Sequence, residues 1–477
     1  MNYKRIIFFL PALLLFCGCG IYTNYQRSET LTVDSLYRDV PGCLQDTSSI
    51  ANLSWRELFT DSQLVKWIEV GLEKNSDIQT ARLLTQEAQA SLQASRQAFL
   101  PSVSLTPEGS LSSFGGAKPS KTYSLGGTAE WEIDAFGGLR NAKKGSLAAL
   151  EASRAYEQAV QTQLVATIAE TYYSLLALDR KLAITRDAAR KWGENVRIMK
   201  ALKRAGEKDE AAVAQAEANR LDAESSALSL EKQMHELENS FSTLVGIAPS
   251  DIKRGQLLEL SFPEKWSVGV PVQLLSKRPD VRQAEWQLAE AFYATNKARS
   301  AFYPQITLSG SAGWTNSSGA GIVNPGKWLL TALGSLVQPL FDKGNNVANL
   351  KIAQAKQQEA LVAFQQKLLD AGAEVNNALT QWQIARKSLK LDHEKVEALN
   401  TALRSTQLLM THGSTNYLEV LTAQQTLLDA QLSEVSDKYD EIEGVISLYQ
   451  ALGGGIFARI YNTSTRTVGP SGRTAQG

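Results

Sequence analysis

The chain has 477 residues, and its 49 lysines and arginines equal its 49 aspartates and glutamates, so its formal net charge is zero. This balance provides no global electrostatic attraction to nucleic acid or to an anionic surface. Hydrophobic residues make up 43% of the sequence, and no run beyond the N-terminus reaches the roughly 18 apolar residues of a membrane-spanning helix. If the chain crosses a membrane, it therefore does so with strands.

The N-terminus has the pattern of an export signal: basic residues, a short apolar stretch and a small residue, Gly18, directly before Cys19. This pattern is typical of a lipoprotein signal peptide over 1–18, after which Cys19 is acylated and becomes the first mature residue. A plain secretory signal is the alternative. Gly20, in place of an aspartate, favours delivery to the outer membrane.

The few cysteines and histidines argue against disulfides and metal sites. Cys17 is removed with the signal and Cys19 is acylated, which leaves Cys43 without a partner for an intrachain disulfide. The histidines stand far apart, with no second ligand at helical or hairpin spacing, so we expect no metal site. They are His235, His393 and His412.

The second half of the mature chain repeats the first at a displacement of roughly 205 residues. Residues 96–101 and 299–304 share an Arg, an Ala, a Phe and a Pro at the same spacing, and each segment leads into an alternating run. A duplicated unit explains these matches better than chance does. The expected segments are an N-terminal extension at 19–53, a first repeat at 54–270, a second repeat at 271–457 and a disordered tail at 458–477.

Each repeat contains a pair of predicted strands, because hydrophobic residues recur there at every second position. Tyr123, Leu125 and Trp131 share one face of such a strand, whereas hydroxyl and carboxylate side chains share the other. These hairpins suit a half-buried sheet of a soluble protein or a transmembrane barrel, and the export signal favours the barrel. Four strands are too few to close a barrel, so other subunits must complete it. The strands are expected at about 102–114, 121–134, 305–316 and 328–341.

A very long helical region follows each strand pair. From Gly138 to Gly206 the chain contains no proline, which at about 1.5 Å per residue allows a rod of roughly 100 Å. Within it Leu164, Ile168 and further apolar residues step alternately by four and three, and a similar heptad seam begins at Leu421. Such helices pack side by side along a narrow stripe and leave a broad polar surface.

Gly206 and Gly413 interrupt the helical pattern at matched places. A helix can end there with a left-handed residue, so each glycine is expected at the tip of a helical hairpin. Near the start of the first repeat, Ser76 or Asp77 is expected to cap the helix that runs to Pro101.

Together these motifs resemble the TolC-like outer-membrane factor family, in the efflux lipoprotein subgroup that serves tripartite efflux systems. The resemblance covers nearly the whole mature chain, and its specificity comes from the joint order of the motifs across the duplicated frame. The motifs are 55–61, 75–78, 99–101, 131–137 (WEIDAFG), 277–281 (KRPDV), 301–304, 338–342, 417–421 (YLEVL) and 448–455.

The resemblance implies a mainly α fold with a β-barrel portion. Three identical subunits would form a 12-stranded outer-membrane β-barrel that continues into a periplasmic α-helical barrel. The channel would conduct passively, while an inner-membrane transporter of the RND type supplies the energy and a periplasmic adaptor, a membrane fusion protein, joins the two. Lipid on Cys19 would be its covalent group, with no other cofactor, and it would contact outer-membrane lipid but not nucleic acid.

In this family the hairpin tips meet the adaptor, and acidic side chains just past the tips narrow the closed pore. Glu419, six residues after Gly413, occupies an acidic gate position, whereas Thr422 stands where a second aspartate is common. Ala212 occupies the matched place in the first repeat, so one candidate carboxylate per protomer remains; the alternative is that Glu419 is a solvated helix residue. The expected adaptor contacts are Arg204, Gly206, Glu207, Lys208, His412, Gly413, Ser414 and Thr415.

The favoured function is therefore a non-enzymatic exit channel for drugs or other small toxic compounds. An outer channel for type I protein secretion and a lipid-anchored helical scaffold or adaptor are the alternatives. An enzyme is disfavoured because the chain has no nucleophile elbow, phosphate loop or metal-ligand spacing. Glu130, Glu132 and Asp134 recur at a strand period and line one face. A wide, water-filled tube selects weakly, so the sequence does not name the exported compound.

Overall fold

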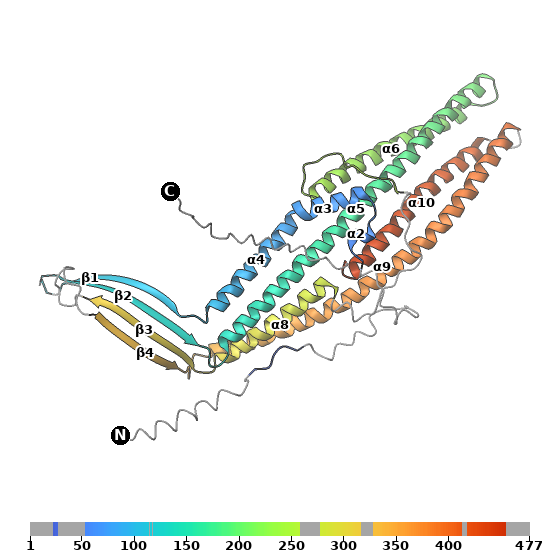
Figure 1. Ribbon diagram of the computed structural model, residues 1–477. Coiled ribbons are helices and arrows are strands. Elements are labelled where there is room, and N and C mark those ends of the chain that lie inside the picture. Colours follow the sequence, from blue (N-terminus) through green and yellow to red (C-terminus); the bar gives the residue numbers. More distant parts are fainter. Residues whose placement is uncertain are drawn as a thin grey trace, which may run out of the picture. The chain divides into compact units, whose positions relative to one another are not determined.

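The protein is described by a computed structural model, which confirms a mainly α fold with a β portion (Figure 1). Predictions on residues beyond the described ranges, including lipidation of Cys19 and the tip contacts of Gly413, Ser414 and Thr415, stay predictions. The described residues are 22–26, 53–113, 115–116, 118–257, 277–315, 328–412 and 417–454.

From the helix before each strand pair onward, the two halves of the chain present the same succession of one helix, two strands and two long helices, as the duplication predicts. Helices α5 and α9 each have 67 residues, and α6 and α10 each have 35. The elements are α2 (Trp55–Leu58), α3 (Ser62–Lys74), α4 (Ser76–Gln97), β1 (Ser102–Ser112), β2 (Ser120–Ile133), α5 (Gly138–Arg204), α6 (Glu210–Leu244), α8 (Pro279–Ser300), β3 (Gln305–Thr315), β4 (Trp328–Val337), α9 (Asn345–Thr411) and α10 (Tyr417–Ala451).

The chain divides into two compact units, and each unit takes segments from both halves of the sequence. The sheet unit comprises Leu72–Gln161 and Arg278–Ala373 together with the N-terminal segment, and it contains all four strands. The hairpin unit comprises Arg38–Gly71, Thr162–Lys277 and Glu374–Gly477. The two repeats therefore fold together rather than as separate bodies.

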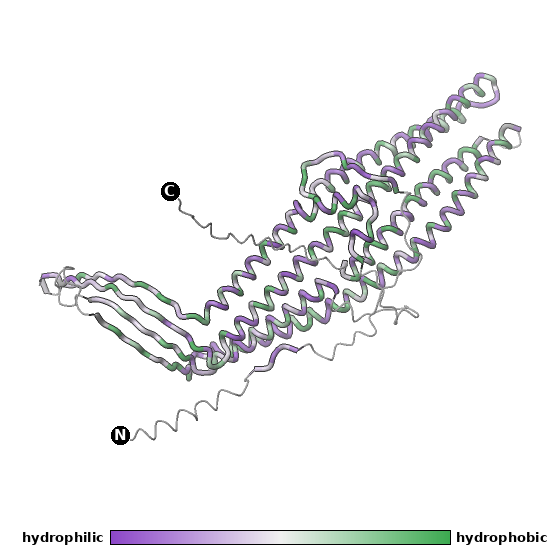
Figure 2. The backbone as a smooth tube through the Cα atoms, in the orientation of Figure 1, coloured by the Kyte–Doolittle hydropathy of each residue, from purple (hydrophilic) through white to green (hydrophobic). Residues whose placement is uncertain are grey.

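The sheet is antiparallel throughout, in the order β1-β2-β3-β4, so β1 and β4 are its edges. Its register separates two faces, because alternate side chains point to opposite sides of a strand. Trp131 pairs with Leu308 on the apolar face, and Glu130 pairs with Ser309 on the polar face. Figure 2 shows polar and apolar residues interleaved along the strands. The alternation seen in the sequence thus defines the two faces.

Strand β4 is shorter than predicted. It ends at Val337, whereas the sequence pattern extended it to Phe341. Pro339 lies in the missing part, and a proline has no N–H group to donate to the ladder. The apolar run after Val337 therefore leaves the sheet, and Leu340 and Phe341 are 93% and 86% exposed.

The predicted cap of α4 is wrong by one residue. The side-chain oxygen of Asn75, rather than Ser76 or Asp77, accepts hydrogen bonds from the N–H groups of Asp77 and Ile78, at 2.8 and 3.1 Å. Asparagine is as good a helix cap as serine or aspartate, so the three adjacent candidates differ only in which one has non-helical backbone angles. Asn75 has them, with φ −61° and ψ 135°.

The core of the hairpin unit follows the predicted heptad seams. Leu164, Ile168 and Leu175 of α5 are buried, as is most of the seam in α10, although Gln425 is exposed. At Gly444 the backbones of α10 and α9 approach closely, since a Cβ atom there would lie 2.8 Å from the Cα atom of Trp382. None of the helices that the structure describes is both long and apolar enough to cross a membrane.

Candidate functional site

The candidate site lies in the hairpin unit and includes two helical hairpin tips. The first tip lies between α5 and α6 in the chain, and the second lies between α9 and α10. At the first tip, α5 ends at Arg204 and Gly206 has a φ of 81°. The N–H groups of Gly206 and Glu207 donate to the carbonyls of Lys203 and Leu202, both at 3.0 Å. These two bonds close a left-handed cap, which confirms the helix end predicted at Gly206.

The chain turns back within a few residues of this cap. The carboxylate of Asp209 caps α6 by accepting from the N–H of Ala212 at 2.9 Å. Lys203 forms an ion pair with Glu210, which ties the end of α5 to the start of α6. Arg204 and Glu207 are exposed and Lys208 is half-buried. The tip is thus a tightly hydrogen-bonded turn that presents charge to solvent.

The second tip is described on both of its sides. Helix α9 runs to Thr411, and the N–H of the exposed His412 donates to the carbonyl of Leu408 at 3.2 Å. Helix α10 starts at Tyr417. The turn predicted at Gly413 therefore falls between two described helices. Gly413 itself is not among the described residues.

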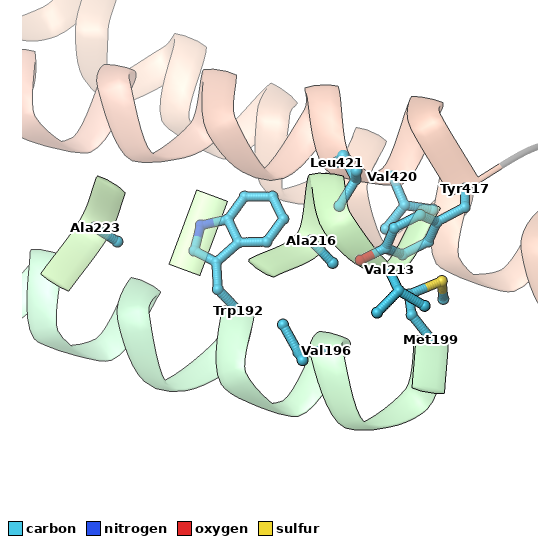
Figure 3. Packing of buried hydrophobic residues seen from close by; sticks show 9 residues of the cluster. All are labelled: Trp192, Val196, Met199, Val213, Ala216, Ala223, Tyr417, Val420 and Leu421. Atoms are coloured by element: carbon cyan, nitrogen blue, oxygen red, sulfur yellow. The ribbon is translucent and has the colours of Figure 1, made fainter. Parts of the chain in front are cut away.

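A cluster of buried side chains, the tip cluster, joins α5, α6 and α10 close to these tips. Figure 3 shows the side chains of the three helices pointing toward one another. Trp192 is 2% exposed and Met199 is 0% exposed, so the interior of the tip cluster excludes water. The members are Trp192, Val196, Met199, Val213, Ala216, Ala223, Tyr417, Val420 and Leu421.

Tyr417 is a functional candidate that sequence reasoning missed. It is the first residue of α10 and 5% exposed, and its hydroxyl is buried without a hydrogen-bond partner among the described residues. Burial raises the pKa of Tyr417 to about 12. An unpaired buried hydroxyl costs about 1–3 kcal/mol. Tyr417 stands one helical turn before Leu421, so extending the predicted seam by one step would have identified it.

A pocket of about 380 Å³ lies between the first tip and the start of α10. It brings together three residues that the sequence singled out, Glu207, Lys208 and Ala212, although the first two were expected at the adaptor contact and the third at the gate. Glu419 and Thr422 do not line it. Its lining residues are Glu207, Lys208, Asp209, Ala212, Gln215, Tyr417, Leu418 and Leu421.

The gate candidates occupy the first turns of α10 and α6. Glu419 is exposed in the first turn of α10, where the positive end of the helix dipole favours a carboxylate. Thr422 is exposed one turn later, and its hydroxyl donates to the carbonyl of Leu418 at 2.9 Å. Ala212 is half-buried and packs against the tip cluster. Of these three positions, Glu419 alone presents a charge.

A second group of carboxyls, also missed by sequence reasoning, lies further along α5 and α10. Burial, reinforced by the charge of Glu443, raises the pKa of Glu170 to about 7. Burial and the nearby Asp440 raise the pKa of Glu443, whose carboxylate accepts from Gln381 at 2.9 Å. Because burial disfavours the charged carboxylate, and the charge of Glu443 adds to this effect, Glu170 is partly protonated near neutral pH. Glu170 and Glu443 are far apart in the sequence, which is why no local motif reveals them.

Two of the three histidines, His235 and His393, lie beside carboxylates in separate places. His393 contacts Glu434 at 2.8 Å, and His235 approaches Glu238 at 3.4 Å. Among the described residues, no group of three or more His, Cys, Asp or Glu side chains is arranged to hold a metal ion.

Comparison with known proteins gives consistent matches along the chain. The family model for outer membrane efflux proteins matches residues 67–247 and 270–454. The chain is 28% identical over 461 residues to the cation efflux system protein CusC of Escherichia coli (strain K12), covering 95% of this chain and 100% of CusC. It is 27% identical over 466 residues to the toluene efflux pump outer membrane protein TtgI of Pseudomonas putida, covering 95% of this chain and 99% of TtgI.

Solved structures match the fold with similar coverage. A crystal structure of CusC superimposes with a TM-score of 0.80 and 25% identity, over 92% of this chain and 100% of that one. The outer-membrane channel OprN gives a TM-score of 0.82 and 25% identity, over 92% and 99%. The likeness therefore extends across the sheet and the long helices alike.

Proposed function

The chain belongs to the outer membrane efflux protein family, and from this premise we propose that three copies assemble into one continuous exit duct. The protein is an outer-membrane channel for efflux.

The four-stranded sheet is the observation that carries the proposal. Its edges, β1 and β4, have no neighbouring strand in the described part of the chain. Unpaired edges invite further pairing, and natural membrane barrels have at least about eight strands. The apolar face suits lipid, and the face with Glu130 and Ser309 suits a water-filled lumen. Three copies supply twelve strands, and a closed ring removes every edge.

The hairpin unit has exposed apolar residues that also call for a neighbour. Leu221 and Leu228 of α6 lie seven residues apart and are 51% and 65% exposed. Ile384 and Leu391 of α9 have the same spacing and are 58% and 65% exposed. Heptad spacing marks an unfilled coiled-coil seam, so these residues support helix packing between protomers. Such packing closes the helices into a periplasmic barrel.

The duct is a passive part of a larger assembly. The charged first tip, with Arg204 and Glu207 exposed, contacts a periplasmic adaptor, and an inner-membrane transporter of the RND type supplies the energy. Three copies of Glu419 near the symmetry axis form the periplasmic gate, where like charges in a narrow throat favour bound cations. Lipid on Cys19 anchors the chain to the outer membrane, and the duct needs no other cofactor.

The duct itself is expected to discriminate weakly among small molecules. CusC is named for cations and TtgI for toluene, yet both are almost equally similar to this chain, at 28% and 27% identity. A water-filled tube whose lumen carries hydroxyls and carboxylates offers no tight pocket for either kind of cargo. Selection therefore takes place in the transporter.

Conductance of the purified protein tests this function. Insertion into planar bilayers should give stable, cation-preferring channels whose conductance rises when Glu419 is replaced. A well-folded preparation that never conducts would overturn the proposal of a duct and favour a lipid-anchored scaffold.

A further inference from the structure

The helices of the sheet unit all meet the sheet at the same end. The register places Ser102 opposite Glu130, Ile133 opposite Ile306, and Gln305 opposite the last residue of β4, Val337. The connections to α4, α5, α8 and α9 therefore emerge together along one rim, which can be followed at the lower end of the strands in Figure 1.

This rim is strongly basic although the chain as a whole is neutral. The segments 95–101, 134–145, 296–304 and 338–351 contain eight lysines and arginines but only two acidic residues, Asp134 and Asp342. A surplus of this size on one rim creates a local positive potential. The basic residues are Arg96, Arg140, Lys143, Lys144, Lys297, Arg299, Lys343 and Lys351.

The two acidic residues are already occupied by local contacts. Asp134 pairs with Arg140 at 3.0 Å and accepts from the N–H of Leu139. Asp342 accepts from the N–H groups of Gly344 and Asn346 at the start of α9, at 3.1 and 2.5 Å. The carboxylate of Asp134 therefore pairs with Arg140, and that of Asp342 binds N–H groups at the start of α9. Neither carboxylate neutralises the surrounding lysines.

The remaining rim cations face solvent without carboxylate partners. Lys143, Lys297, Lys343 and Lys351 are all exposed, and none forms an ion pair within the described ranges. Some cations elsewhere in the same unit are paired, as Lys367 is with Asp280 at 3.0 Å. The four rim lysines, in contrast to Lys367, carry charge that the described part of the protein leaves unneutralised.

Aromatic and apolar side chains border these cations. The ammonium of Lys143 lies 5.8 Å from the ring centre of Phe99, and that of Lys144 lies 5.7 Å from Tyr293. Trp131 donates its indole N–H to the carbonyl of Phe99 at 3.0 Å, and the highly exposed Phe341 lies two residues before Lys343. Aromatic rings beside basic residues are the arrangement that proteins use at the headgroup level of a membrane.

The backbone of Lys343 has a left-handed conformation. Its φ of 60° makes it the one residue other than glycine with a left-handed backbone in the described chain. Glycine adopts this conformation without penalty, whereas a residue with a side chain is strained there. The neighbouring Gly344 also has a positive φ, of 83°, so glycine suits this turn, and Lys343→Gly would relieve the strain while it removes one charge from the rim.

From these observations we propose that the rim binds the anionic headgroups of phospholipids in the periplasmic leaflet of the outer membrane. The inference rests on the membrane barrel of the proposed function and adds a lipid preference to it. Lysine ammonium groups act as mobile point charges that match phosphate, and each contributes to attraction by an anionic surface. Bound headgroups would hold the barrel at a fixed depth and surround it with anionic lipid.

Lipid titration of the full-length protein in detergent tests this inference. Binding of phosphatidylglycerol and of phosphatidylcholine is followed by native mass spectrometry at low and high salt. The rim variant carries Lys143→Gln, Lys297→Gln, Lys343→Gln and Lys351→Gln. A control variant removes four exposed lysines of the hairpin unit, with Lys66→Gln, Lys253→Gln, Lys387→Gln and Lys390→Gln.

We expect the parent and the control to prefer phosphatidylglycerol, and the rim variant to lose at least about tenfold of that preference, since each lysine is worth up to about fivefold. High salt should reduce the preference of the parent. Lys343→Gly alone removes one charge and relieves the backbone, so it should fold well and lose about two- to fivefold.

Conductance in planar bilayers separates the two proposals. Rim and Lys343→Gly variants that conduct like the parent and still bind phosphatidylglycerol as tightly would overturn the lipid site while leaving the duct intact. Equal binding of both lipids by the parent would also overturn it. A parent that binds phosphatidylglycerol selectively but never conducts would instead refute the duct.

Discussion

The tip cluster of the hairpin unit and the strands of the sheet unit place their apolar side chains in opposite environments. In the tip cluster, Trp192 and Met199 are 2% and 0% exposed, so this core is complete within one chain. In the sheet unit, Val103 of β1 and Leu330 of β4 are 78% and 75% exposed, and neither strand has a second neighbouring strand among the described residues. The tip cluster is therefore buried within one chain, whereas the strands leave apolar side chains that the proposed barrel would cover with lipid.

The largest expected effect is on the self-contained core. Trp192→Ala should lower the free energy of unfolding by about 3 to 5 kcal/mol, because it removes a fully buried indole from the tip cluster. Thermal loss of helical circular dichroism in detergent measures the change. Ile198→Ala is the matched control, since Ile198 lies on the same helix but is 48% exposed. Equal losses in the two variants would mean that the tip cluster is not a packed core.

Contacts between copies should come next in size. Leu221→Glu combined with Leu228→Glu places charges in the exposed seam of α6 and should weaken assembly by at least about 2 kcal/mol, because buried unpaired charges are costly. The fraction of assembled protein at falling concentration reports it. Ser226→Glu adds a charge on the same helix at an exposed position about 140° around the helix from Leu221, outside the seam. If Ser226→Glu dissociates the assembly as strongly, the seam is not the interface.

The raised pKa of Glu170 should make the stability of the protein depend moderately on pH. The folded pKa of Glu170 is raised to about 7 from an ordinary 4.5, so the folded state keeps a proton that the unfolded chain loses. Stability is therefore full below about pH 4.5 and declines as pH rises to about 7. After allowance for solvent screening, we expect a loss of about 1 to 2 kcal/mol.

Glu170→Gln isolates this dependence. The variant should be at least as stable as the parent at pH 7.5, and its unfolding free energy should decline less between pH 4.5 and 7. Asp429→Asn, at an exposed position of α10, should keep the parental decline. A decline that is unchanged in Glu170→Gln would assign the effect to other groups.

The smallest effect on stability, below about 0.5 kcal/mol, is expected at the exposed Glu419. Glu419→Ala should nevertheless raise single-channel conductance and weaken block by divalent cations, and Thr422→Asp should strengthen that block. Asp429→Ala serves as the control, because Asp429 is an exposed carboxylate further along the same helix. Identical conductance and block in all these proteins would place the constriction elsewhere, with Arg204 to Asp209 the next segment to test.

Local periodicity in the sequence predicted much of both units, because each period reports one kind of local geometry. The two-residue period predicted which residues of β2 lie on each face of the sheet, including Trp131 on the apolar face. The heptad pattern predicted the buried seam of α5. The cap at Asn75 was misjudged because neighbouring residues of similar capping power compete, and only the backbone angles decide among them.

Local periodicity could not predict features that depend on residues far apart in the sequence. Pairing of β2 with β3 joins the two halves of the sequence, and the pKa of Glu170 depends on Glu443. The meeting of four basic segments at one rim likewise follows from the tertiary arrangement. Such contacts have no local sequence signal, because residues remote along the chain create them.

The mass of the particle extracted from the outer membrane in mild detergent tests the trimeric duct most directly. After subtraction of bound detergent, we expect the mass of three chains, with no helical or strand signal lost on extraction. A well-folded monomer that keeps both its helices and its four-stranded sheet in detergent would contradict the barrel, and with it the duct.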